Sequence, residues 1–286
     1  MERKIFIHTN RKQLFGGKIS KFSFERFLPK DSGITVEFII VNDLPAFQAF
    51  DGVTYKFNDN VERTYSFNDL QSFTLSRFMP PELMQYTGQS IVIDPDIFAL
   101  TDVTELFNLG QKNGTAITAC SKKGHWDSSV MVMDNSQLTH WSMQDILDRL
   151  KNKTATYTQI MQLHAEKSVT ELDRQWNSLD VLNEETKILH TTGRETQPWK
   201  TGLPIDFTRN KMQKLFGIIP REPIHALLGK TKKTYQQHPD QHIEDWFIAL
   251  VVDAYKADAF TEAELQKEMD ANNVRHDMLD ILHKHV

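Results

Sequence analysis

The sequence predicts an α/β protein in which a mostly parallel, mixed sheet is flanked by helices, followed by a helical carboxy-terminal extension. Short β-rich runs alternate with amphipathic stretches over residues 4–193, which is typical of such sheets. The run 34–41 is nearly all apolar, as expected for a strand covered on both faces. From about Pro220 onward only helical patterns recur. We therefore expect a domain over 1–214 and a helical extension over 215–286.

The elements follow one another in a regular order. We expect strands at 4–9, 34–41, 89–94, 114–120, 128–134 and 186–193, the last of them closing the sheet. We expect helices at 16–28, 69–84, 102–109 and 138–152. The helix at 69–84 should stop at Pro80 and Pro81, because proline cannot continue a helix interior. In the extension, Thr261 and Glu264 have the spacing of a capping box.

Composition sets limits on the function. The chain has 286 residues, of which 40% are hydrophobic and 25% charged, as in ordinary globular proteins. Its formal net charge of −5 gives no electrostatic reason to expect nucleic acid or an anionic membrane as a partner. No apolar run is long enough to span a bilayer.

Cys120 is the one cysteine of the chain. A lone cysteine excludes an internal disulfide and fits a reducing compartment. The start of the chain has no apolar segment of the signal-peptide kind. We therefore expect a cytoplasmic protein in which Cys120 is a small buried apolar residue.

The stretch "IVIDPDIF" carries the strongest chemical signal. Asp94 and Asp96 follow an apolar run and can point to the same side, with Pro95 holding the backbone extended. Two converging carboxylates repel unless a cation lies between them, and oxygen ligands suit Mg²⁺, Mn²⁺ or Ca²⁺. The alternatives are a turn with solvated carboxylates, or an aspartate-nucleophile phosphatase. Phe98 disfavours the phosphatase because that motif has Thr or Val at this place.

Several segments together resemble family-8 glycosyltransferases, the group of glycogenin and bacterial lipopolysaccharide galactosyltransferases. The segment "IVIDPDIFALTDVTEL" is similar to the metal-binding segment of that family, where a strand, Asp-x-Asp and a short helix follow in order. The other similar segments, in the family's order, are "IFIHTNRKQLFGGKISKFSFERF", "LSRFMPPELM", "HWDSSVMVMDNSQL" and "ILHTTGRETQPWKTG". The resemblance covers residues 4–202.

The resemblance implies a GT-A-like nucleotide-binding fold and a retaining transfer of a sugar from a nucleotide-sugar, a UDP-sugar by analogy. It implies a Mn²⁺ or Mg²⁺ ion held by Asp94, Asp96 and His190. It places Thr9 and Asn10 at the nucleotide base.

Further roles follow from the same resemblance. Arg77 would lie near the donor phosphates or sugar. Gly193 would let the backbone approach the phosphates. The catalytic set expected in this way is Asp94, Asp96, Arg77 and Gln159. The family's retaining mechanism needs no nucleophile from the protein, so no residue is expected in that role.

The sequence departs from the family pattern at several donor-side positions. Gln197 stands where the family has a lysine that meets the diphosphate, so Lys200 is expected to supply that charge, with Arg194 as the alternative. Asp127 replaces the usual asparagine and is expected to accept a hydrogen bond from a sugar hydroxyl.

The largest departure lies at "YTQIMQL". Gln159 matches the family glutamine, but Thr158 replaces its aspartate. "LDRQWNSLD" resembles a later segment of the family, where Trp176 is expected to pack in the core and Asn177 could shape the acceptor cleft.

Three functions remain open from the sequence. The first is the metal-dependent glycosyltransferase, acting on a glycan, lipid-linked or protein acceptor. The second is a sugar-phosphate nucleotidyltransferase, for which "FGGK" at 15–18 would be a short glycine-rich loop. The third is a domain that binds a nucleotide-sugar or glycan without transfer, since Thr158 removes a carboxylate.

Overall fold

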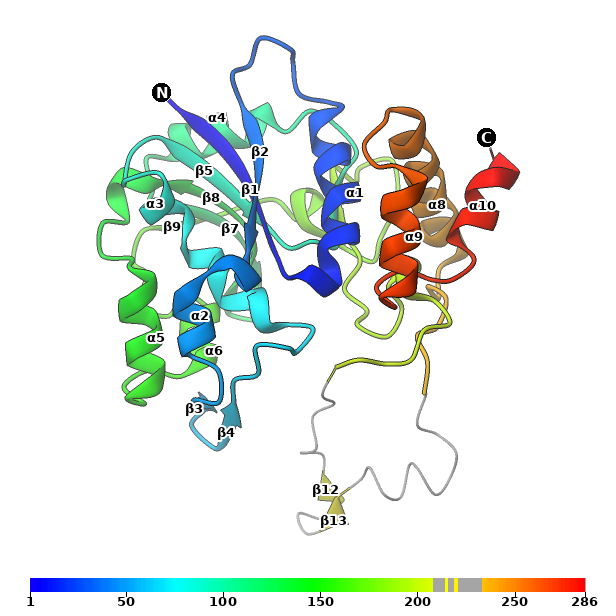
Figure 1. Cartoon of the computed structure of the whole chain (residues 1–286). Helices are drawn as coiled ribbons and strands as arrows, with labels where there is room; N and C mark the ends of the chain where they lie inside the picture. Colours follow the sequence, from blue (N-terminus) through cyan, green and yellow to red (C-terminus); the bar gives the residue numbers. More distant parts are fainter. Residues whose placement is uncertain (208–213, 216–218, 221–232, 286) are drawn as a thin grey trace.

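The computed structural model describes residues 1–207, 214–215, 219–220 and 233–285, and its centre is a six-stranded sheet (Figure 1). The strands lie in the order β2-β1-β5-β8-β7-β9. Their bounds are β1 (Arg3–Thr9), β2 (Thr35–Ile40), β5 (Gln89–Ile93), β7 (Ile117–Lys122), β8 (His125–Asp134) and β9 (Val169–Glu171). Pairings β1–β2, β1–β5 and β7–β9 are parallel, whereas β5–β8 and β7–β8 are antiparallel. The predicted α/β class with a mostly parallel, mixed sheet is confirmed.

Helices cover both faces of this sheet (Figure 1). Those that follow the early strands are α1 (Leu14–Glu25), α2 (Pro45–Ala49), α3 (Pro80–Leu83), α4 (Thr104–Asn113), α5 (Met143–Lys151) and α6 (Tyr157–Met161). Along β5, Ile91 and Ile93 pack in the same cluster as Phe24 of α1, while Val92 packs with Leu150 of α5. This alternation explains why the strand is buried throughout, because each face meets its own helix layer.

A second, three-stranded sheet lies beside the first, with the order β10-β11-β6. Its strands are β10 (Ser178–Leu179), β11 (Ile188–His190) and β6 (Ile97–Ala99). The strand predicted at 186–193 therefore exists as the shorter β11, but its placement as the last strand of the main sheet is wrong. It pairs instead with β6, which the sequence analysis missed because three buried residues show no period.

The helix predicted at 69–84 is also different in the structure. Residues 72–78 form the 3-10 helix η3 (Ser72–Phe78), and Pro80 and Pro81 begin α3 instead of ending a helix. Proline fits the first turn of a helix because the missing N–H has no partner there. A hairpin of β3 (Thr54–Asn58) and β4 (Val61–Thr64) precedes this region.

The two glycines of "FGGK" lie inside α1. A Cβ on Gly16 would come within 2.7 Å of the Trp199 ring, and one on Gly17 within 3.2 Å of Phe38. Trp199 is fully buried in the 3-10 helix η6 (Pro198–Lys200). Gly16 is therefore a site of close packing between α1 and η6, rather than part of a loop.

The carboxy-terminal helices pack against α1 (Figure 1). They are α8 (Gln241–Lys256), α9 (Glu262–Asp270) and α10 (Met278–His285), and the short strands β12 (Lys214–Leu215) and β13 (Ile219–Pro220) precede them. Phe15 and Ile19 of α1 share one apolar cluster with Phe247 and Val251 of α8. The predicted capping box at the start of α9 is confirmed. The proposed boundary between residues 214 and 215 is flanked by residues outside the described part of the chain, and it stays a prediction.

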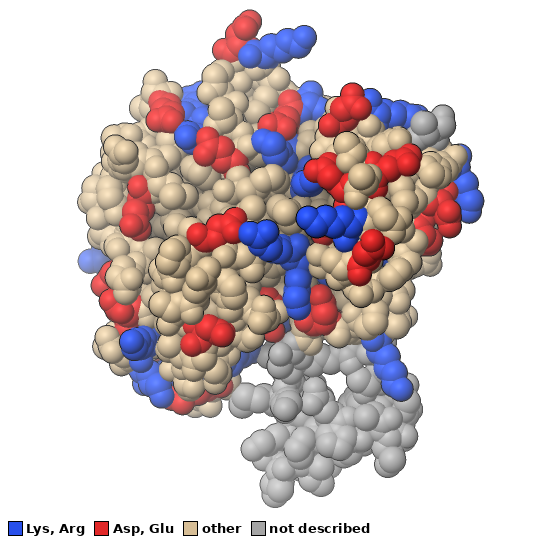
Figure 2. Space-filling model, viewed as in Figure 1, with Lys and Arg blue, Asp and Glu red and all other residues tan. Residues whose placement is uncertain are grey.

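The surface in Figure 2 carries acidic and basic side chains interspersed rather than gathered by sign. Lys18 of α1, for example, lies 3.0 Å from Glu264 of α9. Across the described residues, no helix combines the length and the apolar character needed to cross a membrane. The cytoplasmic location stays a prediction.

Replacing Gly16 by alanine should destabilise the protein although alanine favours helices. The new methyl group would overlap the buried Trp199 ring, which has no room to move, so we expect a loss of about 1–2 kcal/mol relative to Gly17→Ala. Both variants gain the same helix propensity, which makes Gly17→Ala the matched control. Urea unfolding measures the difference, and equal stabilities would contradict this packing role.

Cys120 should react very slowly in the native protein. It is 1% exposed, and burial raises the pKa of its thiol to about 12. At pH 8 only about one molecule in ten thousand would carry the reactive thiolate. Alkylation by iodoacetamide should therefore be slow at pH 8, rise with pH, and become fast in denaturant. Rapid native labelling at pH 8 would show that the thiol is accessible.

Candidate metal and donor site

Asp94 and Asp96 lie where the chain leaves one sheet and enters the other. Strand β5 ends at Ile93 and β6 begins at Ile97, so the two aspartates and buried Pro95 form the connection. Both carboxylates are largely shielded from solvent. The edge of an open α/β sheet at the carboxyl ends of its strands is the usual place for ligands.

Sheet pairing brings His190 to the same point. In the antiparallel pair β11–β6, His190 lies opposite Ile97. Its Nε2 is 3.7 Å from Oδ1 of Asp96. One potential ligand atom from each of Asp94, Asp96 and His190 lies within 4.8 Å of the others. The expectation that these three side chains converge is thus met by the geometry.

A chain of hydrogen bonds leaves Nε2 of His190 free to bind a metal. Ser129 Oγ lies 2.6 Å from the Asp127 carboxylate, to which it must donate, and 2.9 Å from Nδ2 of Asn177. The amide of Asn177 therefore points its oxygen at Nδ1 of His190, 2.9 Å away. An amide oxygen only accepts, so Nδ1 carries the hydrogen and Nε2 keeps its lone pair. Histidine ligands are commonly oriented in this way, and the donor set fits a divalent ion.

Asp94 is held from two sides. Nη2 of Arg77 lies 2.7 Å and 3.0 Å from its two oxygens, and Nε2 of His8 lies 2.5 Å from Oδ1. Burial alone would raise the pKa of Asp94, but Arg77 and His8 outweigh it and hold that pKa well below its usual range. Asp94 is therefore a carboxylate at neutral pH.

Asp96 lacks such partners. Burial raises its pKa to about 6, the imidazole of His190 opposes this shift, and the charge of Asp94 adds to it. Of the two aspartates, Asp96 is thus the one whose negative charge is less well compensated by the protein. A cation shared with Asp94 and His190 would compensate that charge.

His8 is the site residue that the sequence analysis missed. Its Nδ1 lies 3.1 Å from the carbonyl of Phe73, and the side chain is fully buried. Its Nε2 faces the Asp94 carboxylate, so His8 connects that aspartate to the backbone of η3. Burial lowers the pKa of His8, and the charge of Asp94 opposes this. A polar residue at the end of an apolar strand was the available signal.

Arg77 lies beside Asp94 of the Asp94, Asp96 and His190 cluster, and its predicted contact with the donor stays a prediction. It comes from η3 and is 5% exposed. Its Nη1 donates to Ser128 Oγ at 2.8 Å, while its Nε is buried without a hydrogen-bond partner. With Nη1 on Ser128, Arg77 contacts Asp94 through Nη2.

Thr9 and Asn10 lie at the end of β1 and are both buried. Thr9 donates to the carbonyl of Asn10 at 3.1 Å. Asn10 donates from Nδ2 to the carbonyls of Asp69 and Leu70, and its Oδ1 accepts from the Gln13 N–H. The Asn10 side chain thus connects the end of β1 to residues 69–70 and to Gln13. Contact of either residue with a base stays a prediction.

Gln159 and Thr158 lie in the first turn of α6. The side-chain oxygen of Gln159 accepts from the Thr156 N–H at 2.9 Å, completing a capping box. Thr158 Oγ1 donates to the Phe57 carbonyl at 2.8 Å. Gln159 and Trp141, which lies just before α5, both line a pocket of about 320 Å³. Its expected catalytic role stays a prediction.

The segment after β11 carries the remaining predicted residues. A Cβ on Gly193 would meet Thr196 Oγ1, so glycine allows this tight turn. Lys200 is fully buried, with Nζ 3.3 Å from Asp206. Burial lowers the pKa of Lys200, and Asp206 opposes this. The structure thus places the Lys200 ammonium against Asp206.

Arg194 and Gln197 differ in their surroundings. Gln197 is buried and its Oε1 accepts from Gln13 Nε2 at 3.0 Å. Arg194 is exposed. Partial desolvation lowers the pKa of Arg194, and nearby charges, the carboxylate of Asp96 among them, oppose this.

Asp127 anchors the hydrogen-bond chain that ends at His190. Its Oδ1 accepts from Ser129, and Oδ2 lies 3.4 Å from Nη1 of Arg174. Burial would raise the pKa of Asp127, but the hydrogen bonds from Ser129 lower it overall. Contact between Asp127 and a sugar stays a prediction.

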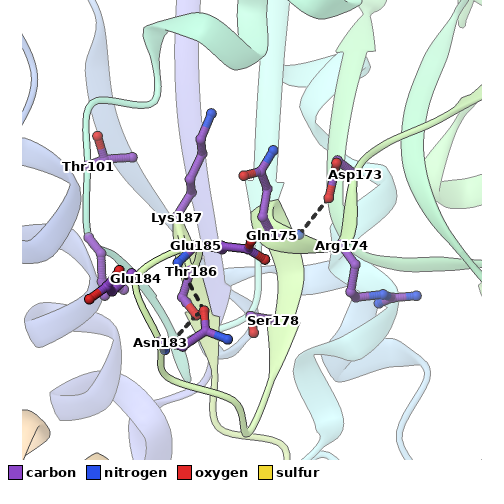
Figure 3. Close-up of a pocket in the computed structure, with 11 residues that line it drawn as sticks. Thr101, Asp173, Arg174, Gln175, Ser178, Asn183, Glu184, Glu185, Thr186 and Lys187 are labelled. Carbon is purple, nitrogen blue, oxygen red and sulfur yellow. Dashed lines mark hydrogen bonds between the residues drawn. The ribbon is translucent and has the colours of Figure 1, made fainter.

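A polar pocket of about 670 Å³ lies next to η5 (Arg174–Asn177), the 3-10 helix that supplies Asn177 (Figure 3). Many of its polar groups bond to one another: Asp173 accepts from the Gln175 N–H at 3.0 Å, and Thr186 from the Asn183 N–H at 3.1 Å. We assign no ligand to it.

Comparison with known proteins gives structural likenesses only. No protein-family model matches the chain, and no curated protein sequence matches it. The WbbM bifunctional glycosyltransferase, in apo form, is 14% identical with a TM-score of 0.49, over 70% of this chain and 47% of its own. The glycosyltransferase GlyE of Streptococcus pneumoniae TIGR4 is 12% identical with a TM-score of 0.48, over 91% and 64%.

A third solved structure is the galactosyltransferase LgtC in complex with donor and acceptor sugar analogues. It is 11% identical with a TM-score of 0.46, over 81% of this chain and 97% of its own. All three are glycosyltransferases, the class that the sequence motifs resemble. The chain spans about half the length of WbbM and less than two thirds of GlyE. The function of this chain is therefore argued from its own site.

Replacing Asn177 by alanine should weaken Mn²⁺ binding. Without the amide oxygen, Nδ1 of His190 loses the partner that fixes its tautomer, and such losses cost about 10–100-fold in metal affinity. Titration followed by electron paramagnetic resonance of free Mn²⁺ measures the effect. Asn183→Ala, which removes an asparagine of the neighbouring loop, is the control and should keep wild-type affinity. Unchanged affinity in Asn177→Ala would remove Asn177 from the site.

Proposed function

We propose that this chain is an enzyme, a metal-dependent, retaining glycosyltransferase that transfers a sugar from a nucleotide-sugar to an acceptor. The observation that carries this proposal is the convergence of Asp94, Asp96 and His190 at the junction of the two sheets. The resemblance of the surrounding motifs to family-8 glycosyltransferases supports a UDP-sugar as donor. The acceptor class stays open among glycans, lipid-linked sugars and proteins.

The three converging side chains would hold Mn²⁺ or Mg²⁺. When bound, the ion would neutralise the charge that develops on the departing diphosphate. Arg77 keeps Asp94 ionised and oriented, because it contacts both carboxylate oxygens. Asn177 keeps the Nε2 lone pair of His190 available by accepting the Nδ1 hydrogen.

The positive charge that would meet the diphosphate is better supplied by Arg194 than by Lys200. Lys200 is fully buried against Asp206, so using it would require breaking that pair. Arg194 is exposed, and Asp96 is among the charges that act on it. Guanidinium groups also suit phosphate oxygens, since they can donate two parallel hydrogen bonds.

The other donor contacts are carried over from the resemblance. Thr9 and Asn10, at the carboxyl end of β1, would border the base. Gly193 would let the backbone approach the phosphates. Asp127 would accept a hydrogen bond from a sugar hydroxyl through the lone pairs that Ser129 and Arg174 leave free.

The two alternative functions have less support. A nucleotidyltransferase would need a glycine-rich loop after the first strand, but Gly16 and Gly17 lie inside α1 and pack against Trp199 and Phe38. A domain that binds without transfer is favoured by one feature, since the hydroxyl of Thr158 is bonded to a backbone carbonyl where the family has a carboxylate. Assay of transfer decides between these functions.

Donor binding should depend on both the metal and Asp96. In a thermal-shift screen of UDP-, GDP- and CDP-sugars, we expect one nucleotide to raise the unfolding midpoint only with Mn²⁺. At a hundredfold excess over the dissociation constant the gain is about 2.7 kcal/mol. Asp96→Asn keeps the side-chain shape but removes its charge, so the shift should vanish. Transfer should fall about a thousandfold, because several kcal/mol of charge stabilisation are lost.

Three results would redirect the proposal. A shift that is unchanged in Asp96→Asn would place the donor elsewhere. Release of pyrophosphate from a nucleoside triphosphate and a sugar phosphate would identify a nucleotidyltransferase. Tight donor binding with neither hydrolysis nor transfer to a panel of sugar acceptors would identify a binding domain.

A further inference from the structure

The backbone that bears His190 is fastened on both sides. The N–H of Thr191 donates to the carbonyl of Asp96 at 3.0 Å, and the N–H of Asp180 donates to the carbonyl of His190 at 3.0 Å. The carboxylate of Asp180 also accepts from the Thr192 N–H at 2.9 Å and from the Thr192 hydroxyl. Asp180 therefore spans residues 190 to 192 and holds them against β10.

His238, from the carboxy-terminal part of the chain, holds Asp180 in turn. Its Nε2 lies 3.2 Å from Oδ1 of Asp180, and its side chain is 1% exposed. The carboxylate of Asp180 only accepts, so Nε2 carries the hydrogen that it donates, and Nδ1 accepts from the Asp240 N–H at 3.1 Å. The sequence around His238 does not reveal this contact, because the burial of His238 and its approach to Asp180 depend on distant parts of the chain.

His238 is itself part of a rigid arrangement. Its backbone N–H donates to Oε2 of Glu244 in α8, at 3.1 Å. The other oxygen of Glu244 accepts from Nη1 of Arg275 at 3.0 Å. The N–H of Arg275 donates to the Trp199 carbonyl at 2.7 Å, and its Nη1 lies 3.4 Å from the Pro198 carbonyl. The bonds thus form a continuous series from Asp180, just after β10, through Glu244 and Arg275 to η6.

Apolar packing holds the same elements together. Phe247 of α8 has its ring 5.3 Å from that of Phe98 in β6 and 5.5 Å from that of Trp199 in η6. Phe98 follows the two aspartates directly along β6. The carboxy-terminal helices therefore contact both segments that leave the metal cluster, the one after Asp96 and the one after His190.

We propose that the carboxy-terminal helical segment positions His190 for the metal, with His238 and Asp180 as the positioning residues that transmit this constraint. The consequence for metal affinity rests on the proposed function, whereas the constraint on residues 190–192 does not. A polar contact that only stabilised the fold would connect to surface or core groups, but this one ends, through the Asp180 carboxylate, on Thr192, two residues after a proposed metal ligand.

The test uses the full chain with His238→Ala, His238→Gln and a control, His283→Ala. Glutamine can still donate a hydrogen bond to Asp180. His283 is an exposed histidine of the same helical segment, 3.0 Å from Glu262. Hydrogen–deuterium exchange of a peptide covering residues 188–194 measures the constraint, and Mn²⁺ titration followed by electron paramagnetic resonance measures affinity.

We expect exchange in 188–194 to be about tenfold faster in His238→Ala, with Mn²⁺ affinity about tenfold lower, at the low end of the range for indirect metal partners. His238→Gln should restore most of both values, and the control should match wild type. Asp180→Asn tests the other side of the same hydrogen bond and should act in the same direction, also where His238→Ala fails to fold.

Two outcomes would overturn the proposal. One is wild-type exchange in 188–194 for both His238→Ala and Asp180→Asn. The other is equally accelerated exchange in residues 246–252 of α8, since that would mean general loosening rather than loss of one constraint. A wild-type chain that binds no Mn²⁺ would refute the proposed metal function alone, because the exchange measurement decides the positioning role without metal.

Discussion

Asp94 and Asp96 place two carboxylates within a few ångströms of each other at the junction of two sheets, largely out of water. Such charges are costly unless they are paired or hydrogen-bonded. The protein compensates them unequally. Arg77 and His8 surround Asp94, so its charge is settled before any ligand arrives, while Asp96 faces only the imidazole of His190. Among the described residues, the charge of Asp96 is therefore less well compensated than that of Asp94.

The histidine of the cluster is oriented by groups that are not among the three potential metal ligands. The order of donors from Ser129 to Asn177 to His190 follows from one fixed point, the carboxylate of Asp127, which can only accept. Each step then has a single orientation that satisfies its neighbour. The availability of the Nε2 lone pair thus depends on every hydrogen bond from Asp127 to His190.

The carboxy-terminal helices belong to the same system rather than to a separate unit. Phe247 packs against the segments that follow the aspartates and the histidine. The hydrogen bonds of His238 connect the same parts of the chain. Side-chain packing alone limits how far elements can separate, but hydrogen bonds also fix orientation. A site that needs three ligand atoms in a defined geometry benefits from both.

The sequence by itself determined five of the strands of the main sheet, since apolar runs such as 91–93 are bounded by polar residues, and it located Asp94 and Asp96 at the end of one of them. The resemblance of motifs added His190 and Arg77, and the structure brings both close to the aspartates. Tertiary structure alone decided the roles of His8, Asn177 and His238, and the packing role of Gly16. Each depends on a partner far along the chain, and such partners are brought together by strand register, as between β6 and β11, and by helix packing, as between α1 and η6. Local sequence carries no record of either, because periodicity reports which face of an element is buried and not what covers it.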